Sequence, residues 1–536
     1  MISSDRAQGV NWRDFLKGSN PALADKLTGP VTGSDPRDED HRLARIFVLA
    51  KHGRNKDARL GLEDMRAHFR DASLGNTRLG REFRLVEAHV RVYEDRPSTA
   101  ADAQELRHVL DTLPREDLIG QALAFNLLCI HALHSGNFDR AQEHAEIAIR
   151  LYRKGDAEFG SLHLHPHLGQ IKLMRGDLEG SAAQYAEMEA RLNGLPDDTD
   201  GLLAVCRALR SEVAYETNDL SLSRDLLAGA IKSVEDDDAW LDVRAAAYRV
   251  RTRLAFAQAG LPAALTELAH CERMAEQRRM PRLKRLMQIE RLRVLTLSGE
   301  VGPAAAMMHQ LGLKPNTYDF DDGRNWALRQ GSTAVAIARW LVRSRRAPDA
   351  LAFVGLAEDF AIRGGQLLSL AKLRVIKASA HWHLNQKQEA TQTLLSSLRL
   401  LGPQPFRRFI LDEGREVFAI VQAALDGARV SVAISPEHRR RLSELSHAWV
   451  TQSTSPVSRK RQSADPSDEA SLQRKYLDLL SLGLSNKEIA RTMGVTVNTV
   501  KYHLKVLFSD LRVANRTAAV AEGRRLGMLS MEPRDT

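Results

Sequence analysis

The stretch LHSGNFDRAQEHAEIAIRLY, residues 133–152, joins two helical segments through a turn at Gly136. In the segment after the turn, Ala141, Ala145 and Ala148 recur at the i, i+4, i+7 spacing that places side chains on one face of an α-helix. Small side chains on such a face let two helices approach closely. The stretch therefore predicts a helical hairpin with a tightly packed second helix.

Similar hairpins recur along the chain from about Asp40 to Asp426. Turn residues, each following one apolar helix and preceding another, are Gly53, Arg96, Gly136, Gly176, Asn218, Gly260, Gly299, Arg345 and Asn385. Their spacing of 39 to 46 residues indicates a repeat architecture. Five places beyond eight of these turns stand the small residues Ala58, Ala101, Ala141, Ser181, Ser223, Ala304, Ala350 and Ala390, whereas Ala264 comes one place early after Gly260.

This pattern resembles tetratricopeptide-type repeats in their longer form of about 40 residues. We therefore expect an all-α fold, with nine hairpins stacked into a tetratricopeptide-like α-solenoid over residues 41–440. The groove of a solenoid suits a small molecule, a peptide or a protein, although the repeats could also serve as a spacer. Near the irregular insert around Arg324, Trp326 and Trp340, both a pocket and ordinary core packing stay open.

Composition and motifs exclude several functional classes. No apolar run approaches the ~20 residues needed to span a bilayer, and the first residues lack an export signal, so we expect a cytoplasmic protein without membrane contact. The three cysteines lie too far apart for a metal knuckle, and the tract at His163, His165 and His167 has no carboxylate at ligand spacing. Because the chain contains no Gly-Lys dipeptide, it lacks the usual phosphate-binding loop. We expect neither an enzyme nor a cofactor.

Charge and composition divide the chain further. Residues 1–40 form an N-terminal segment before the repeats, and residues 441–468, which include the Ser- and Pro-rich run TQSTSPVSRKRQSADPSD, are expected to be a flexible linker. In the last part, residues 469–536, ten Lys or Arg stand against four Asp or Glu between Gln473 and Gly527. Such a concentration of positive charge on a small domain is typical of nucleic-acid binders.

The motif GLSNKEIARTMGVTVNTVKYHLKVL, residues 483–507, predicts two helices joined by a short turn. Ser485 and Glu488 have the spacing of a capping box, Gly494 ends the first helix, and Thr496 caps the second. The spacing of a small residue, a glycine and a β-branched residue, Ala490, Gly494 and Val500, is that of a helix-turn-helix.

The second helix of this motif has a polar face suited to DNA. If Val500, Leu504 and Leu507 face the core, the basic and amide side chains face outward, where they can contact base edges in the major groove. The start of the preceding helix is placed for the phosphate backbone. The candidate DNA-binding residues are Asn486, Lys487, Thr496, Asn498, Thr499, Lys501, Tyr502 and Lys505. A solvated helix surface is the alternative reading.

Residues 483–520, GLSNKEIARTMGVTVNTVKYHLKVLFSDLRVANRTAAV, resemble the LuxR-type DNA-binding domain. The resemblance implies four helices, with Val497 to Phe508 as the recognition helix. It also implies that the positions of Lys501, Tyr502 and Lys505 read bases, and that Thr517 to Leu526 form a fourth helix that often contacts a second copy. Gln473 stands where that family usually has Glu.

Upstream, PFRRFILDEGREV, residues 405–417, resembles the segment that closes the repeats of MalT-like regulators. In those proteins an ATPase module precedes the repeats, and we expect this chain to lack it. Together the resemblances imply a bacterial transcription factor associated with the nucleoid, which binds double-stranded DNA as a homodimer and holds an inducer or protein partner in the solenoid groove. RNA polymerase is a candidate partner. The alternative is an interaction scaffold tethered to DNA, with no small-molecule ligand.

Overall fold

The protein consists of two compact units, Met1–Trp449 and Val450–Thr536, which are described separately. The structure is a computed structural model that describes residues 10–18, 21–28, 39–68, 77–195, 199–236, 239–320, 327–427, 432–453, 466–493, 497–511, 513, 515–526 and 528–529. Over these residues it contains helices and no strand, which confirms the all-α prediction. None of the described helices is long and apolar enough to cross a membrane.

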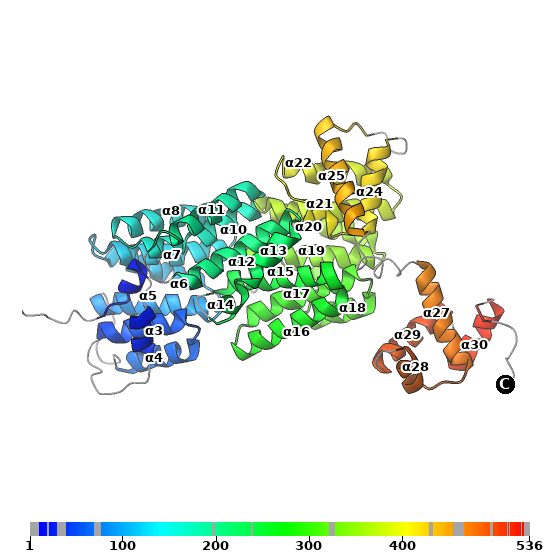
Figure 1. Cartoon of the computed structure of the whole chain (residues 1–536), viewed down its shortest axis with the longest axis horizontal. Helices are drawn as coiled ribbons and strands as arrows, with labels where there is room; N and C mark the ends of the chain where they lie inside the picture. The colour runs from blue at the N-terminus through cyan, green and yellow to red at the C-terminus, as the bar shows by residue number, and fades with distance from the viewer. Residues whose placement is uncertain are drawn as a thin grey trace, which may run out of the picture. The chain divides into compact units, whose positions relative to one another are not determined.

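The first unit is a succession of paired helices (Figure 1). Its elements are α1 (Asp14–Lys17), α2 (Pro21–Thr28), α3 (Glu39–Lys51), α4 (Asn55–His68), α5 (Arg78–Tyr93), α6 (Ala100–Thr112), α7 (Leu118–His134), α8 (Phe138–Lys154), α9 (Glu158–Leu162), α10 (His165–Met174), α11 (Leu178–Leu192), α12 (Asp200–Glu216), α13 (Leu220–Ala228), α14 (Ile231–Asp236), α15 (Leu241–Ala259), α16 (Leu261–Gln277), α17 (Pro281–Leu297), α18 (Val301–Gln310), η1 (Pro315–Thr317), α19 (Ala327–Arg343), α20 (Ala347–Arg363), α21 (Leu367–His383), α22 (Lys387–Leu400), α23 (Arg408–Leu411), α24 (Arg415–Asp426) and α25 (Pro436–Ser453).

The nine predicted hairpins are present in the described part of the chain, as α3–α4, α5–α6, α7–α8, α10–α11, α12–α13, α15–α16, α17–α18, α19–α20 and α21–α22. Eight of the nine predicted turn residues have a positive φ. In the second hairpin the left-handed residue is Asp95, with φ 57°, and not the predicted Arg96. Asp95 is buried, and its carboxylate accepts hydrogen bonds from the backbone and the side chain of Arg282.

The position of the small residue in each hairpin is fixed by the start of the second helix and not by the distance from the turn. In each of the nine pairs, the fourth residue of the second helix is Ala or Ser and is buried. Ala141 and Ala264 both obey it and are fully buried, although they stand at different distances from their turns. The prediction of Ala101 was wrong: this residue is exposed, and Ala103 takes the buried position. Helix α6 begins only at Ala100, after a capping box formed by Thr99 and Asp102, so the spacing from its turn is longer.

The repeats stack so tightly that distant hairpins meet. Each first helix contacts the first helix of the next pair, as in α12 with α15, α15 with α17 and α17 with α19. Contacts also join α7 to α19 and α10 to α21. In the turn after α10, Gly176 lies against the side chain of Leu401, which directly follows α22. The inner faces of the first helices are therefore enclosed within the unit.

Both ends of this unit differ from the predicted domain boundaries, which set residues 1–40 and 441–468 apart from the repeats. In the expected N-terminal segment, Trp12, Phe15 and Leu16 are buried in the core of the unit, and α1 packs on α9. At the other end, residues 441–453 were expected in the flexible linker but belong to α25. Leu445 of this helix is buried, and Trp449 stacks on Phe418 of α24 with ring centroids 5.3 Å apart. Residues 454–465 lie outside the described residues.

The second unit contains the four predicted helices, α27 (Pro466–Ser481), α28 (Asn486–Met493), α29 (Val497–Asp510) and α30 (Arg516–Arg525). Its core is formed by Tyr476, Leu477, Leu480, Ile489, Ala490, Val500, Leu504, Leu507, Ala519 and Leu529. Helix α27 contacts α29 and α30, and α28 contacts α29. This small core holds the two helices of the motif in a fixed relation.

Candidate nucleic-acid interface and buried charged pocket

Helix α28 begins with the predicted capping box. The backbone N–H of Ser485 donates to Oε2 of Glu488 at 2.7 Å, and the backbone N–H of Glu488 donates to Oγ of Ser485 at 3.3 Å. Hydrogen bonds from Ser485 to the carboxylate lower the pKa of Glu488. The loop before this helix is also held by Arg516, whose guanidinium donates to the carbonyl of Leu484. The entry to α28 is thus fixed from two sides.

Helix α29 has the orientation that the sequence predicted. Val500 is fully buried, Leu504 and Leu507 are almost so, and Lys501 is exposed. His503 packs beside Tyr476 of α27, with ring centroids 5.2 Å apart. The apolar face of α29 therefore lies against the core, and its Lys501 side points to solvent.

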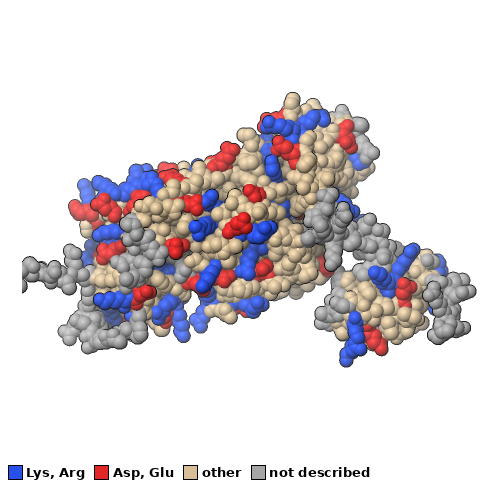
Figure 2. Space-filling model, viewed as in Figure 1, with Lys and Arg blue, Asp and Glu red and all other residues tan. Residues whose placement is uncertain are grey.

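The structure describes the side chains of three of the eight candidate residues. Lys487 and Lys501 are exposed on α28 and α29, and Asn486 is half-buried at the first position of α28. Thr496 lies outside the described residues. The backbone of Asn498, Thr499, Tyr502 and Lys505 is part of α29, but their side chains lie outside the described part of the structure. Figure 2 shows Lys and Arg side chains projecting from this unit.

A second feature, which the sequence did not predict, is a charged pocket inside the first unit. We name it the inner-wall pocket, because five successive first helices, α12, α15, α17, α19 and α21, contribute to it together with α10 and α23. Its lining residues are Met174, Glu212, Glu216, Arg249, Arg253, Ile289, Glu290, Arg293, Ser332, Val335, Arg339, Leu368, Ser369, Lys372, Arg408, Phe409 and Asp412. It encloses about 50 Å³ of free space.

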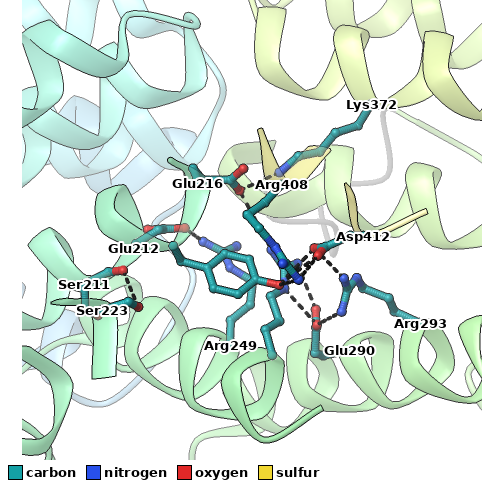
Figure 3. Close-up of polar contacts among 12 residues, drawn as sticks. Ser211, Glu212, Glu216, Ser223, Arg249, Glu290, Arg293, Lys372, Arg408 and Asp412 are labelled. Carbon is teal, nitrogen blue, oxygen red and sulfur yellow. Dashed lines mark hydrogen bonds and ion pairs between the residues drawn. The ribbon is translucent and has the colours of Figure 1, made fainter. Parts of the chain in front are cut away.

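Glu290 of α17 forms ion pairs with two arginines of this pocket (Figure 3). Its two oxygens accept from Nε and Nη2 of Arg253 at 2.9 and 3.1 Å, and Oε1 also accepts from Nη1 of Arg293 at 3.0 Å. Burial alone would raise the pKa of Glu290, but the two guanidinium groups lower it to about 2. The carboxylate is therefore ionised while almost wholly removed from solvent.

Asp412, directly after α23, is the second buried carboxylate of the cluster (Figure 3). It accepts from Nη2 of Arg293 at 2.7 Å and from the hydroxyl of Tyr215 at 3.0 Å, and it pairs with Arg408. Burial opposes its ionisation, but Arg408 and Arg293 hold the pKa of Asp412 well below its usual range. The neighbouring Glu413 forms a two-oxygen ion pair with Arg339 of α19.

These contacts assign a position to the segment PFRRFILDEGREV. Arg408, Asp412 and Glu413 all come from it, and they bind Tyr215 of α12, Arg293 of α17 and Arg339 of α19, respectively. Its backbone is also held, because the N–H of Arg407 donates to the carbonyl of Glu216 at 2.9 Å. The segment therefore closes the inner-wall pocket. The signal that sequence reasoning missed is the pair of charges three or four residues apart within α12, α15 and α17.

The α21 side of the pocket carries a half-buried lysine. Nζ of Lys372 donates to Oε1 of Glu216 at 2.8 Å, and burial lowers the pKa of Lys372. One turn earlier on the same helix, Ser369 also lines the pocket. In another ion pair of the pocket lining, Arg249 of α15 binds Glu212 of α12.

The other places that the sequence singled out hold no comparable cluster. His163, His165 and His167 are buried, and burial lowers the pKa of His167 to about 4. Among the described residues no group of His, Cys, Asp and Glu side chains is arranged to hold a metal ion. Arg324 and Trp326 lie outside the described residues, and Trp340 is half-buried against the core.

Comparison with known proteins agrees with the division of the chain into a repeat unit and a small C-terminal unit. Residues 81–426 match the family model of the MalT-like TPR region, and residues 472–522 match that of the bacterial regulatory proteins of the luxR family. The HTH-type transcriptional regulator AlkS of Alcanivorax borkumensis is 35% identical over 106 residues, which cover 18% of this chain and 12% of that protein. The HTH-type transcriptional regulator MalT of Yersinia pestis is 24% identical over 164 residues, 28% of this chain and 18% of that protein. The chain thus matches less than a fifth of the length of either relative.

A solved structure extends the comparison of the fold. The Rap protein, in a crystal structure of its complex with Competence and Sporulation Factor, aligns over 68% of this chain and 99% of its own, with a TM-score of 0.52 and 12% sequence identity. This similarity shows a shared helical fold alone. The family match spans well over half of the chain and includes α23, the closing element of the inner-wall pocket. The chain therefore belongs to the MalT-like TPR region family and carries, after its repeats, a domain of the luxR family of bacterial regulatory proteins.

Proposed function

We propose that the protein is a DNA-binding transcriptional regulator whose repeat unit senses an inducer or a protein partner. The observation that carries the proposal is the orientation of α29 within a luxR-family domain: Val500, Leu504 and Leu507 are buried, while Lys501 is exposed. The relatives named above are transcriptional regulators, which supports the same reading.

In this proposal α29 enters the major groove. Lys501 donates to guanine O6 or N7, whereas Lys487, at the start of α28, contacts phosphate. Thr496, Asn498, Thr499, Tyr502 and Lys505 remain candidate contacts to bases and backbone, with Asn486 beside the phosphates. A homodimer would place two such helices on half-sites about one helical turn apart.

The repeat unit would control this binding. A signal shifts an equilibrium only if it binds one state more tightly than the other, so the inducer or partner must prefer the repeat arrangement that favours DNA binding, or the opposite one. The Rap structure supports the plausibility of a ligand in this fold, since that protein was crystallised with a bound factor. The protein would act in the cytoplasm, associated with the nucleoid, with RNA polymerase as a further partner.

The experiment that tests DNA binding uses the full chain. A random duplex library is selected on the purified protein, and the enriched sequence is then measured by fluorescence anisotropy at two salt concentrations. We expect an enriched, partly symmetric motif and an affinity that falls with salt, because bound lysines release counterions from the DNA. Failure to hold any duplex at low ionic strength would refute the proposal.

The second candidate function is a scaffold tethered to DNA, in which the repeats bind only a protein. The inner-wall pocket favours a small ligand, because most of the charged side chains that line it are at most 9% exposed. Titration of the full chain with small molecules, compared with affinity capture from lysate, separates the two. Saturable binding of a small molecule that changes DNA affinity would exclude the scaffold.

A further inference from the structure

The inner-wall pocket brings together ten charged side chains in the interior of the repeat unit. Pairs of charged side chains stand three or four residues apart on α12, α15 and α17, and therefore share a face of each helix. They are Glu212 and Glu216, Arg249 and Arg253, and Glu290 and Arg293, and all six are at most 9% exposed. Apolar residues of similar size are often as stabilising as a buried ion pair. The presence of two buried charges in each of three neighbouring hairpins therefore points to a role other than packing.

The described side chains of the pocket carry more positive than negative charges. Six cationic and four anionic side chains line it. A fifth carboxylate, that of Glu413, binds the lining residue Arg339 from outside. Among the residues that the structure describes, six cations thus face five carboxylates, an excess of one positive charge. An anion in the pocket would balance this excess.

Lys372 supplies the donors that such an anion needs. An ammonium group has three N–H donors. Among the described residues the one hydrogen-bond partner of Lys372 is Glu216, at 2.8 Å. The Lys372 side chain is 21% exposed, so the pocket can be reached from solvent at α21. Ser369, one turn away on the same face, adds a hydroxyl to the lining. The free space of about 50 Å³ exceeds the roughly 10–15 Å³ that one water molecule requires.

We propose that the inner-wall pocket binds the acid group, a carboxylate or a phosphate, of a small organic anion, with Lys372 as a direct ligand. The inference rests on the proposed function, in which the repeat unit senses an inducer, and gives that inducer its chemical class. A bound anion would join α21 to the α12 and α15 helices of the same wall.

The test is isothermal titration calorimetry on the full chain with four probes: inorganic phosphate, glucose 6-phosphate, succinate and, as the neutral control, glucose. We expect saturable binding of at least one anion and none of glucose. The phosphate and succinate arms distinguish the two acid groups. Lys372→Gln should weaken binding at least tenfold, whereas Lys372→Arg, which keeps the charge, should bind within a few-fold of the wild type.

The matched control is Lys377→Gln. This lysine lies on the same helix, but its ammonium pairs with Glu358 at 2.7 Å and does not line the pocket, so its removal should leave anion binding unchanged. Thermal unfolding of each variant shows whether the repeats remain folded. Equal affinity of the wild type and a folded Lys372→Gln variant would overturn the inference.

Absence of saturable binding of all three anions at roughly 10 mM, where a Kd of about 1 mM is readily detected, would also overturn it. DNA binding is measured on the same samples. If DNA binds and no anion does, the inference fails alone. If an anion binds and no duplex does, the proposed function fails, and the pocket assignment stands.

Discussion

Arg293 and Asp412 lie 119 residues apart in the sequence, yet Nη2 of the guanidinium is 2.7 Å from Oδ2 of the carboxylate. Both side chains are at least nine-tenths buried. The contact joins α17, in the seventh hairpin, to the segment that follows the last hairpin. It therefore fixes α23, which also contacts α12, against the inner wall and closes the pocket.

The first prediction concerns this contact. Asp412→Asn removes the charge but not the volume; it leaves Arg408 buried without its carboxylate partner and Arg293 with Glu290 alone. We expect the free energy of unfolding of the first unit to fall by about 3–5 kcal/mol, measured by urea denaturation. The control is Asp349→Asn, because Asp349 forms a largely exposed pair with Arg346. That change should stay within about 0.5 kcal/mol of the wild type, and equal effects of the two would contradict the prediction.

The second prediction is a pH dependence caused by His167. Burial lowers its pKa from 6.5 to about 4, so between these values the unfolded chain binds a proton that the folded chain does not. Its contribution to stability is fully present above pH 6.5 and is lost progressively as the pH falls towards 4. The free energy of unfolding should therefore fall by at most about 1.4 kcal/mol for each pH unit in this range.

Urea denaturation of the full chain at pH 7, 6 and 5 measures this slope. His167→Gln should show a smaller loss of stability over the range than the wild type. His41→Gln is the control, since His41 is exposed on α3 and is solvated in the folded and the unfolded state. If the wild type and His167→Gln lost stability in parallel, another group would be responsible.

The features that could be predicted from the sequence are local. A turn residue such as Gly136 and a buried alanine four residues into the next helix depend only on neighbours along the chain, and the capping box at Ser485 is equally local. The wrong predictions depend on distant contacts. The second turn falls at Asp95 because Arg282, 187 residues away, binds its carboxylate.

The inner-wall pocket escaped prediction for the same physical reason. Glu216 or Arg253 within a helical segment has the appearance of a surface charge, and it becomes a buried one only when α12, α15 and α17 enclose it. The end of the first unit was also misjudged. The sequence of α25 is mostly polar, and its place in the core rests on a few apolar contacts, those of Leu442, Leu445 and Trp449.

The third prediction separates base contacts from phosphate contacts. On a selected DNA site, Lys501→Ala should weaken binding by about 1–3 kcal/mol and broaden the base preference. Lys487→Ala should weaken binding to all DNA sequences alike. It should also reduce the slope of log affinity against log salt concentration by about one. Lys475→Ala, on the exposed side of α27, is the control that removes a similar charge outside the motif. Anisotropy titrations at several salt concentrations measure all three, and an unchanged affinity of Lys501→Ala would contradict the assigned orientation of α29.

The last prediction tests the rule for the small residues in the hairpins. Ala141 and Ala101 have the same sequence spacing from the predicted turns, but Ala141 is the fully buried fourth residue of α8, whereas Ala101 is the exposed second residue of α6. Ala141→Leu must push α8 away from α7 and should cost about 1–3 kcal/mol.

Ala101→Leu places the same side chain in solvent and should change stability by no more than about 0.5 kcal/mol. Because Ala and Leu differ little in helix propensity, the difference between the two variants reports packing and not helix formation. Urea denaturation of both in the full chain gives the comparison. A large cost for Ala101→Leu would mean that this residue, and not Ala103, packs between the helices of the second hairpin, because only a closely packed position resists added volume.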